Sequence, residues 1–299
     1  MHLLLAITFV TLVHSTDATL VTWIEDAHVK ARVGDTTIDL GNGNDVRAAT
    51  DGHDFQIVWV DQGRVLGTRW SKPSEIQTFG NGDRTPPVVW NGSAFQLFAG
   101  SDAAAALQGV ALTTTGASTA AYTFCSPFPT FGGPKCTDVA ATFRIDWTVR
   151  SNDAPSRSFT TASDEVSSPA AVAGNDEFLI VWKSSIAIEG VRVHRDGSTA
   201  SFINVPMMGK GRPQVAWDGT RYLIVFEAGS DVWGAFVTPG LTYVAQPFAI
   251  AATSAEETAP AVAAIGPDRF AVAYVVDKGQ IATRVVSFNE PPSKRRAAR

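Results

Sequence analysis

The sequence predicts an all-β protein made of seven similar repeats. Three observations support this fold class. A short strand motif returns seven times, the same turn and proline signals precede most copies, and no segment of useful length has helical periodicity. The chain has 299 residues, of which 45% are hydrophobic and 18% charged, so it is long enough to bury a large core as a single domain.

The repeated motif has apolar side chains at its first, third and fifth positions in most copies, which is the period of a strand with a buried face. Aromatic and β-branched residues dominate it, as strands favour. Five copies are clear and two are weaker. The clear copies are Phe55–Trp59, Phe143–Trp147, Phe178–Trp182, Tyr222–Phe226 and Phe270–Tyr274, and the weaker ones are Thr19–Trp23 and Phe95–Ala99.

Three further strands are predicted around each motif. The opening strand begins near a proline and leads into an Asp-Gly or Asn-Gly pair, which is the signal of a type I′ hairpin turn. These pairs are Asp51-Gly52, Asn91-Gly92 and Asp218-Gly219. Third strands are expected at 28–33, 65–70, 107–112, 188–193, 232–237 and 280–285, most with a glycine at one shared position, and fourth strands at TTIDL, EIQTF, ASFINV and QPFAI.

Four short antiparallel strands in each of seven repeats are typical of a seven-bladed β-propeller, because blades packed face to face around an axis bury what a single blade leaves exposed. The first and last blades are expected to be incomplete. The first lacks a clear opening strand, and the last lacks a fourth strand after Phe288. A β-sandwich is the alternative, but its strands are not expected to repeat one four-part pattern.

The succession of proline, Val-Ala, Asp-Gly and Tyr-Leu-Ile-Val-Phe resembles the repeats of exported bacterial β-propeller-like proteins, over roughly residues 19–286. The resemblance implies the propeller fold and an exported location. It implies no particular activity, because propellers include lectins, hydrolases and scaffolds.

The two ends of the chain differ from the repeats. Residues 3–13 are largely apolar but too short to span a bilayer, so residues 1–15 are predicted to be a signal peptide. The alternative is a β-strand that completes the first repeat. The propeller domain is then 16–288, and 289–299 is a basic, disordered tail. We accordingly expect a secreted, periplasmic or cell-surface protein.

Cys125 and Cys136 are separated by a loop rich in proline and glycine that allows the two thiols to meet. In an oxidising compartment we expect them to form a disulfide, which stabilises by about 3 kcal/mol in the chain-entropy model. Two buried free thiols are the alternative.

The net charge of -5 and the lack of a basic stripe within the repeats argue against a nucleic-acid partner. The five histidines share no ligand spacing and the possible calcium loops hold too few carboxylates, so no metal and no cofactor are predicted. We expect a monomer without a membrane span.

Several residues are candidates for a site. Trp90 and Trp217 precede hairpin turns, where aromatic rings can stack on sugars, although packing in the core is the alternative. Asp146 replaces an apolar or neutral residue of the strand motif, so it is either exposed or specialised. Four arginines share one position of the third strand and are interpreted as structural, through carboxylate pairing or packing of their stems. They are Arg32, Arg69, Arg192 and Arg284.

Two functional classes follow from these residues. The first is a non-catalytic binding module for a glycan or a protein. The second is a glycan-processing hydrolase, which needs a pair of carboxylates near one another. The predicted innermost strands, among them VRAAT and PQVAW, supply no carboxylate, and this favours binding over catalysis.

Overall fold

The structure, a computed structural model, describes residues 7–82, 85–86, 88–90, 95–97, 108–114, 117–127, 143–151, 154–163, 167–174, 177–184, 187–194, 199–239, 245–277 and 279–288. These residues form 25 strands and no helix, so the all-β prediction is confirmed for them. Within the same ranges, no helix is long and apolar enough to cross a membrane.

The described strands pair into antiparallel sheets whose members follow one another in chain order. The first sheet contains β1 (Ile7–His14), β2 (Thr19–Glu25), β3 (His28–Val33) and β4 (Thr36–Asn42). The second contains β5 (Val46–Thr50), β6 (Phe55–Asp61), β7 (Arg64–Arg69) and β8 (Lys72–Asn81), and the third β9 (Val88–Trp90) and β10 (Phe95–Leu97). The fourth contains β11 (Gln108–Thr114), β12 (Ala117–Pro127), β13 (Phe143–Ser151) and β14 (Ala154–Ser163), and the fifth β15 (Ser167–Ala173), β16 (Glu177–Lys183), β17 (Ile188–His194) and β18 (Thr199–Val205). The sixth contains β19 (Lys210–Trp217), β20 (Tyr222–Ala228), β21 (Asp231–Val237) and β22 (Phe248–Ala251), and the last β23 (Glu257–Gly266), β24 (Arg269–Val276) and β25 (Gln280–Ser287).

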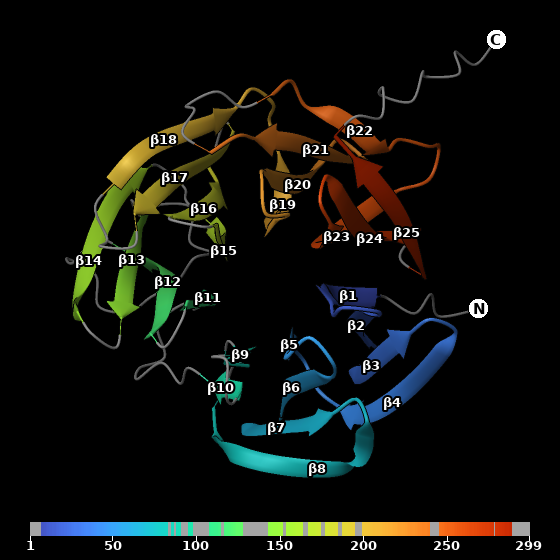
Figure 1. The fold of residues 1–299 in the computed structure, drawn as a ribbon. Coiled ribbons are helices and arrows are strands. Elements are labelled where there is room, and N and C mark those ends of the chain that lie inside the picture. Colours follow the sequence, from blue (N-terminus) through green and yellow to red (C-terminus); the bar gives the residue numbers. More distant parts are fainter. Residues whose placement is uncertain are drawn as a thin grey trace.

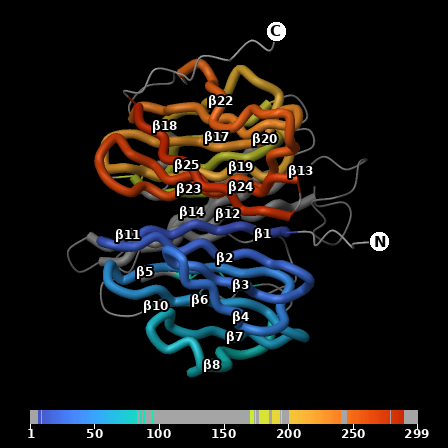
Figure 2. The backbone as a smooth tube through the Cα atoms, turned by 90° about the vertical axis from the view of Figure 1, so that its right-hand side faces the viewer, coloured from blue at the N-terminus to red at the C-terminus, as the bar shows by residue number. Residues whose placement is uncertain are grey.

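The sheets lie around a common centre, with the first strand of each sheet innermost (Figure 1). Each first strand contacts the first strand of the next sheet, in the order β1, β5, β9, β11, β15, β19 and β23. Strand β23 in turn contacts β1, and Figure 2 shows β1 next to the strands of the last sheet. The later strands of each sheet extend outward from this centre (Figure 1).

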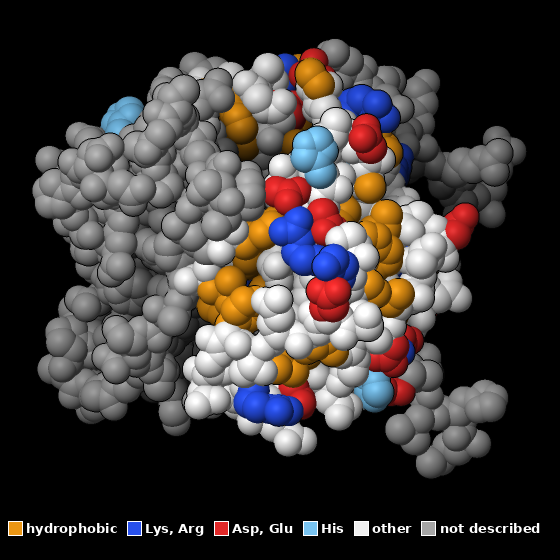
Figure 3. Space-filling view, turned by 60° about the horizontal axis from the view of Figure 1, so that its bottom comes forward, with side chains coloured by type: hydrophobic (Ala, Val, Ile, Leu, Met, Phe, Trp, Pro, Cys, Tyr) orange, Lys and Arg blue, Asp and Glu red, His pale blue; other side chains and the backbone are white. Residues whose placement is uncertain are grey.

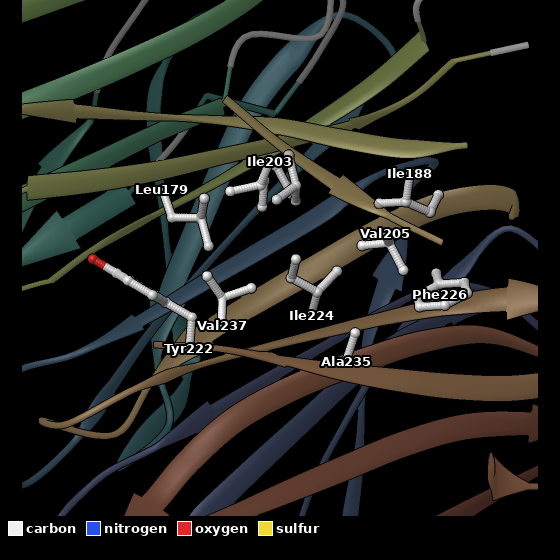
Figure 4. Close-up of a cluster of buried hydrophobic side chains, with 11 residues drawn as sticks. Leu179, Ile188, Ile203, Val205, Tyr222, Ile224, Phe226, Ala235 and Val237 are labelled. Carbon is white, nitrogen blue, oxygen red and sulfur yellow. The ribbon is translucent and has the colours of Figure 1, made fainter. Parts of the chain in front are cut away.

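The second strand of a sheet is the most deeply buried. In β6, β16 and β20 every residue of the five-residue motif is buried, so both faces of the sheet are covered. Neighbouring sheets supply the cover. Figure 4 shows side chains of the fifth and sixth sheets meeting in one cluster, in which Leu179 and Ile203 face Tyr222, Ile224 and Val237.

The Asp-Gly hairpins have four-residue loops, so the prediction of type I′ turns is wrong for Asp51-Gly52 and Asp218-Gly219. Thr50 pairs with Phe55, and only the glycine of each pair has a positive φ, of 94° at Gly52 and 102° at Gly219. The aspartate stabilises the loop differently. Its Oδ1 atom accepts hydrogen bonds from the backbone N–H groups two and three residues later, which is the Asx-turn arrangement.

Prolines and glycines occupy special places, as the sequence suggested. Pro169, Pro213 and Pro260 lie in innermost strands at shifts of register, where a missing donor costs least. At Gly190 an added Cβ would lie 2.6 Å from the backbone oxygen of Ile180. The third-strand glycine therefore marks a close approach of two backbones.

The N-terminal segment forms a strand in this structure. Strand β1 is antiparallel to β2, and its residues Ile7, Val10 and Leu12 are buried against the last sheet. The first sheet thus has four strands, and the prediction that it is incomplete is wrong. The last sheet has three described strands, as expected. Removal of residues 1–15 as a signal peptide stays a prediction.

Two strands were assigned to the wrong place. Residues 107–112 were expected as a third strand, but β11 pairs with β12 and begins the fourth sheet. The motif Phe143–Trp147 was expected as a second strand, yet β13 is third, between β12 and β14. The reason is physical: alternation of apolar side chains is common to all half-buried strands and does not encode a strand's rank within its sheet.

Candidate functional site

A cavity of about 160 Å³ lies where the innermost strands meet. The lining side chains come from β1, β5, β9, β15, β19 and β23, which places the cavity at the centre of the ring in Figure 1. Most of them are small or aliphatic, and three are polar. The lining residues are Thr11, Leu12, Val13, Arg47, Ala48, Val88, Ala171, Gln214, Ala261 and Val262.

Arg47 and Gln214 occupy the same position of the repeat. Arg47 pairs with Val58 and Gln214 with Val225, and both valines are the fourth residue of the strand motif. Thr11 has this position in the first sheet, because it pairs with Thr22. Thr11, Arg47 and Gln214 therefore have the same position in the first strands of three sheets, and all three residues line the cavity.

The Arg47 guanidinium makes no hydrogen bond to the described residues. Its one ion pair is distant, with 3.8 Å between Nη2 and Oδ2 of Asp45, although only 19% of the side chain is exposed. The other oxygen of Asp45 is buried without a hydrogen-bond partner. The Gln214 amide also makes no hydrogen bond within the described ranges, whereas the Thr11 hydroxyl bonds to that of Thr22. The cavity thus presents unused donors.

Arg192 is a contrasting case in the same molecule. It is buried, and it binds Glu177 through both ends of the fork, at 2.8 Å from Nε to Oε1 and 2.5 Å from Nη2 to Oε2. Tyr222 of the next sheet donates to Oε1 at 3.2 Å. Burial, and then the neighbouring carboxylate, raises the pKa of the Tyr222 hydroxyl. This network joins the fifth and sixth sheets, and in it the guanidinium and the carboxylate are hydrogen-bonded to each other.

The third-strand arginines are structural, as interpreted, but they form two classes. Arg69 and Arg192 pair with the second residue of the strand motif, while Arg32 and Arg284 pair with the third. A shift of one residue turns a side chain to the opposite face of its sheet. Accordingly Arg69 binds Asp51 and Asp54, at 2.6 and 2.9 Å, whereas Arg32 lies over the Trp23 ring and Arg284 donates to the Ile250 carbonyl.

The other candidates are only partly described. Trp217 is half-buried, and its ring lies 4.4 Å from that of Tyr222, so packing accounts for at least part of its role. Trp90 ends β9 and Asp146 lies in β13 opposite Thr160, but both side chains are outside the described residues. Cys125 lies in β12 and Cys136 is outside the described residues, so the disulfide stays a prediction.

On the face that Figure 3 shows, the described residues mix side chains of several kinds. In Figure 3, lysine and arginine lie beside aspartate and glutamate on the face around the second sheet. Pairs such as Lys72 with Glu75 and Arg64 with Asp61 account for part of this mixture. Exposed apolar side chains, among them Ile76 and Phe79 of β8, are scattered between them. The central cavity is therefore the better candidate site.

The described lining of the cavity contains no side chain of the kind that acts as a carboxylate acid or base. None of the residues that line the cavity is an aspartate or glutamate. Within the described ranges no group of three or more His, Cys, Asp or Glu side chains is arranged to hold a metal ion. What the cavity offers is a cation, an amide and a hydroxyl, which are groups for binding.

Comparison with known proteins places the chain in the β-propeller fold class. No protein-family model matches it, and no curated protein does either. Solved structures that resemble it include a subtype N10 neuraminidase-like protein of A/little yellow-shouldered bat/Guatemala, with a TM-score of 0.51 and 10% identity over 95% of both chains. Aleuria aurantia lectin, solved with alpha-methyl-L-fucoside, has a TM-score of 0.53 and 11% identity over 96% of this chain and 97% of the lectin. The Hadza microbial sialidase Hz136 has a TM-score of 0.54 and 8% identity over 95% of this chain and 66% of the sialidase.

These likenesses, at such low identity, concern the fold alone. They agree with the four-stranded antiparallel sheets described above and support the propeller interpretation over the β-sandwich.

Proposed function

We propose that this protein is an exported, seven-bladed β-propeller that binds a glycan without catalysing its hydrolysis. The observation that carries the proposal is the central cavity, where Arg47 and Gln214 present unused donors and none of the described lining residues is a carboxylate. A cavity with a few convergent polar groups among apolar ones is the usual form of a small-ligand site. Hydroxyl-rich ligands such as sugars match an amide, a guanidinium and a hydroxyl.

The contacts between first strands support seven blades. Each of the seven described sheets contributes its first strand to the central contacts, and β23 meets β1. A closed ring of blades has only short, protected edges, which is the physical advantage of a propeller. The neighbouring solved structures include a lectin and a sialidase, so glycan chemistry occurs on this architecture.

Binding is favoured over hydrolysis because a glycosidase requires two carboxyl groups separated by about 5 to 9 Å across the scissile bond. The described cavity has none among its lining residues. Asp45 is the carboxylate next to Arg47, and a single carboxylate does not supply both an acid and a base or nucleophile.

The test combines a glycan array with a panel of chromogenic glycosides on the purified full-length chain. We expect binding without turnover. Gln214→Ala is expected to weaken binding about tenfold or less, since it removes one neutral hydrogen-bonding group from the cavity. Gln77→Ala on the exposed β8 is the control and leaves binding unchanged. Turnover that disappears when a single carboxylate is replaced would overturn the proposal in favour of the hydrolase.

A further inference from the structure

Arg47 carries a partly buried charge that the described part of the protein pairs only at a distance. A buried charge is costly unless it is paired and hydrogen-bonded. Two other arginines are paired more closely, since Arg192 and Arg69 each form two bonds of 2.5 to 2.9 Å to carboxylates. Arg47 has only the 3.8 Å approach to Asp45 and no hydrogen bond to a described residue, and its side chain lines the cavity.

We propose that the central cavity takes a carboxylate-bearing sugar of single-ring size, with its carboxylate on Arg47. The inference rests on the proposed function and names the ligand class. The planar guanidinium presents paired donors whose spacing matches the two oxygens of a carboxylate. Gln214, at the same level of the repeat, donates to or accepts from a ring hydroxyl.

The charges around the cavity favour a monoanion over a dianion. Among the described residues that line the cavity, Arg47 is the one charged side chain. A carboxylate has a single negative charge, whereas a phosphate monoester has about -1.5 to -2 at neutral pH and requires further cations. Asp45 sits nearby and makes a dianion still less favourable.

The cavity has room for about one ring. Its volume is about 160 Å³. An engineered protein cavity of about 150 Å³ accommodates benzene, a single six-membered ring. The apolar part of the lining, from Leu12, Val88 and Val262, can contact the less polar face of a sugar ring. The polar part, from Arg47 and Gln214, can bind the hydroxyl and carboxylate groups of the sugar.

The experiment is calorimetric titration of the full-length chain with matched sugar pairs, glucose against glucuronate and galactose against galacturonate, with galactose 1-phosphate as the third arm. We expect at least one acid to bind about tenfold or more tightly than its neutral partner, since a charge-assisted bond contributes about 1.5–3 kcal/mol. The phosphate is expected to bind more weakly than the acid. Arg47→Gln is expected to abolish the preference for the acid, and Arg64→Gln, an exposed arginine of the same sheet, leaves it intact.

A second variant tests the inference independently in case Arg47→Gln does not fold. Gln214→Glu keeps Arg47 but adds a negative charge at the same level, so it is expected to lose the acid while retaining weak binding of the neutral sugar. Equal affinity for acid and neutral sugar overturns the inference and leaves the proposed function standing. A preference for the phosphate, or a preference that survives Arg47→Gln, also overturns it. Failure of the chain to bind any of these sugars or any glycan on the array overturns both.

Discussion

Leu12 tests whether the N-terminal segment is part of the folded domain. The strand interpretation buries Leu12, at 8% exposure, in a cluster with Trp23 of its own sheet and Ala261, Ala273 and Val275 of the last sheet. The signal interpretation removes this residue from the mature protein. A substitution at Leu12 therefore changes the stability of the protein only if β1 is retained.

The size of the effect follows from the groups removed. Leu12→Ala deletes three carbon groups, at about 0.8 kcal/mol for each buried methylene, and leaves a space behind. Leu12 also borders the central cavity, so part of its surface has no packing partner to lose. We therefore expect a loss of about 2–3 kcal/mol, at the lower end of the range of about 2–5 kcal/mol seen for such substitutions in cores.

The assay is urea unfolding of the full-length chain, with an intact N-terminus verified by mass. Thr8→Ala is the matched control, because Thr8 is exposed on the same strand and its loss is expected to change stability by less than about 0.5 kcal/mol. An unfolding free energy for Leu12→Ala equal to that of Thr8→Ala would refute the packing of β1. So would a mature exported chain that starts at residue 16 and is as stable as the full chain.

Three other outcomes are expected. Asp51 has a pKa of about 2 against an ordinary 3.8, because hydrogen bonds from backbone N–H groups and from an arginine outweigh the effect of its burial. Its contribution to stability is present above about pH 4 and is lost as the pH falls toward 2, so Asp51→Asn is expected to reduce the pH dependence of unfolding between pH 4 and pH 2. An unchanged pH dependence in this variant contradicts the Asp51 turn. Gly190→Ala forces a Cβ to 2.6 Å from a backbone oxygen and is expected to cost about 1–3 kcal/mol in urea unfolding; a neutral effect contradicts the close strand approach. Non-reducing mass spectrometry of exported protein is expected to show Cys125 and Cys136 two hydrogens lighter, and free thiols there contradict the disulfide.

Much of the fold was predictable because its signal is local and repeated. The period-two motif located β6, β16, β20 and β24, and the third strand at 28–33 matches β3 in full. The exceptions required long-range information. Residues 107–112 have the pattern of a third strand, yet their pairing partner is β12, and nothing in the pattern distinguishes the two arrangements. The four-residue loops depend on the carboxylates of Asp51 and Asp218, which the Asp-Gly pair alone does not reveal.

The candidate site was harder to predict because no single segment contains it. Its described lining comes from six first strands, and the cavity exists only because those strands converge. The predicted innermost strands VRAAT and PQVAW lack carboxylates, but the first contains an arginine and the second an amide side chain. A signal was present. Aligned on the strand motif, Arg47 and Gln214 are polar at a position where Ala170 and Ala261 are small and apolar.

That alignment gives a general reason to regard the centre as the functional part. Two other arginines of this chain have close carboxylate partners within one sheet, as Arg69 does with Asp51 and Asp54 and Arg192 does with Glu177. Such pairs gain stability from geometry that the sheet already fixes. Arg47 lies in an equally regular strand but reaches a cavity, with no hydrogen bond to the described residues. This contrast between Arg47 and the two arginines that serve the fold is the reason why we propose a partner from solution for Arg47.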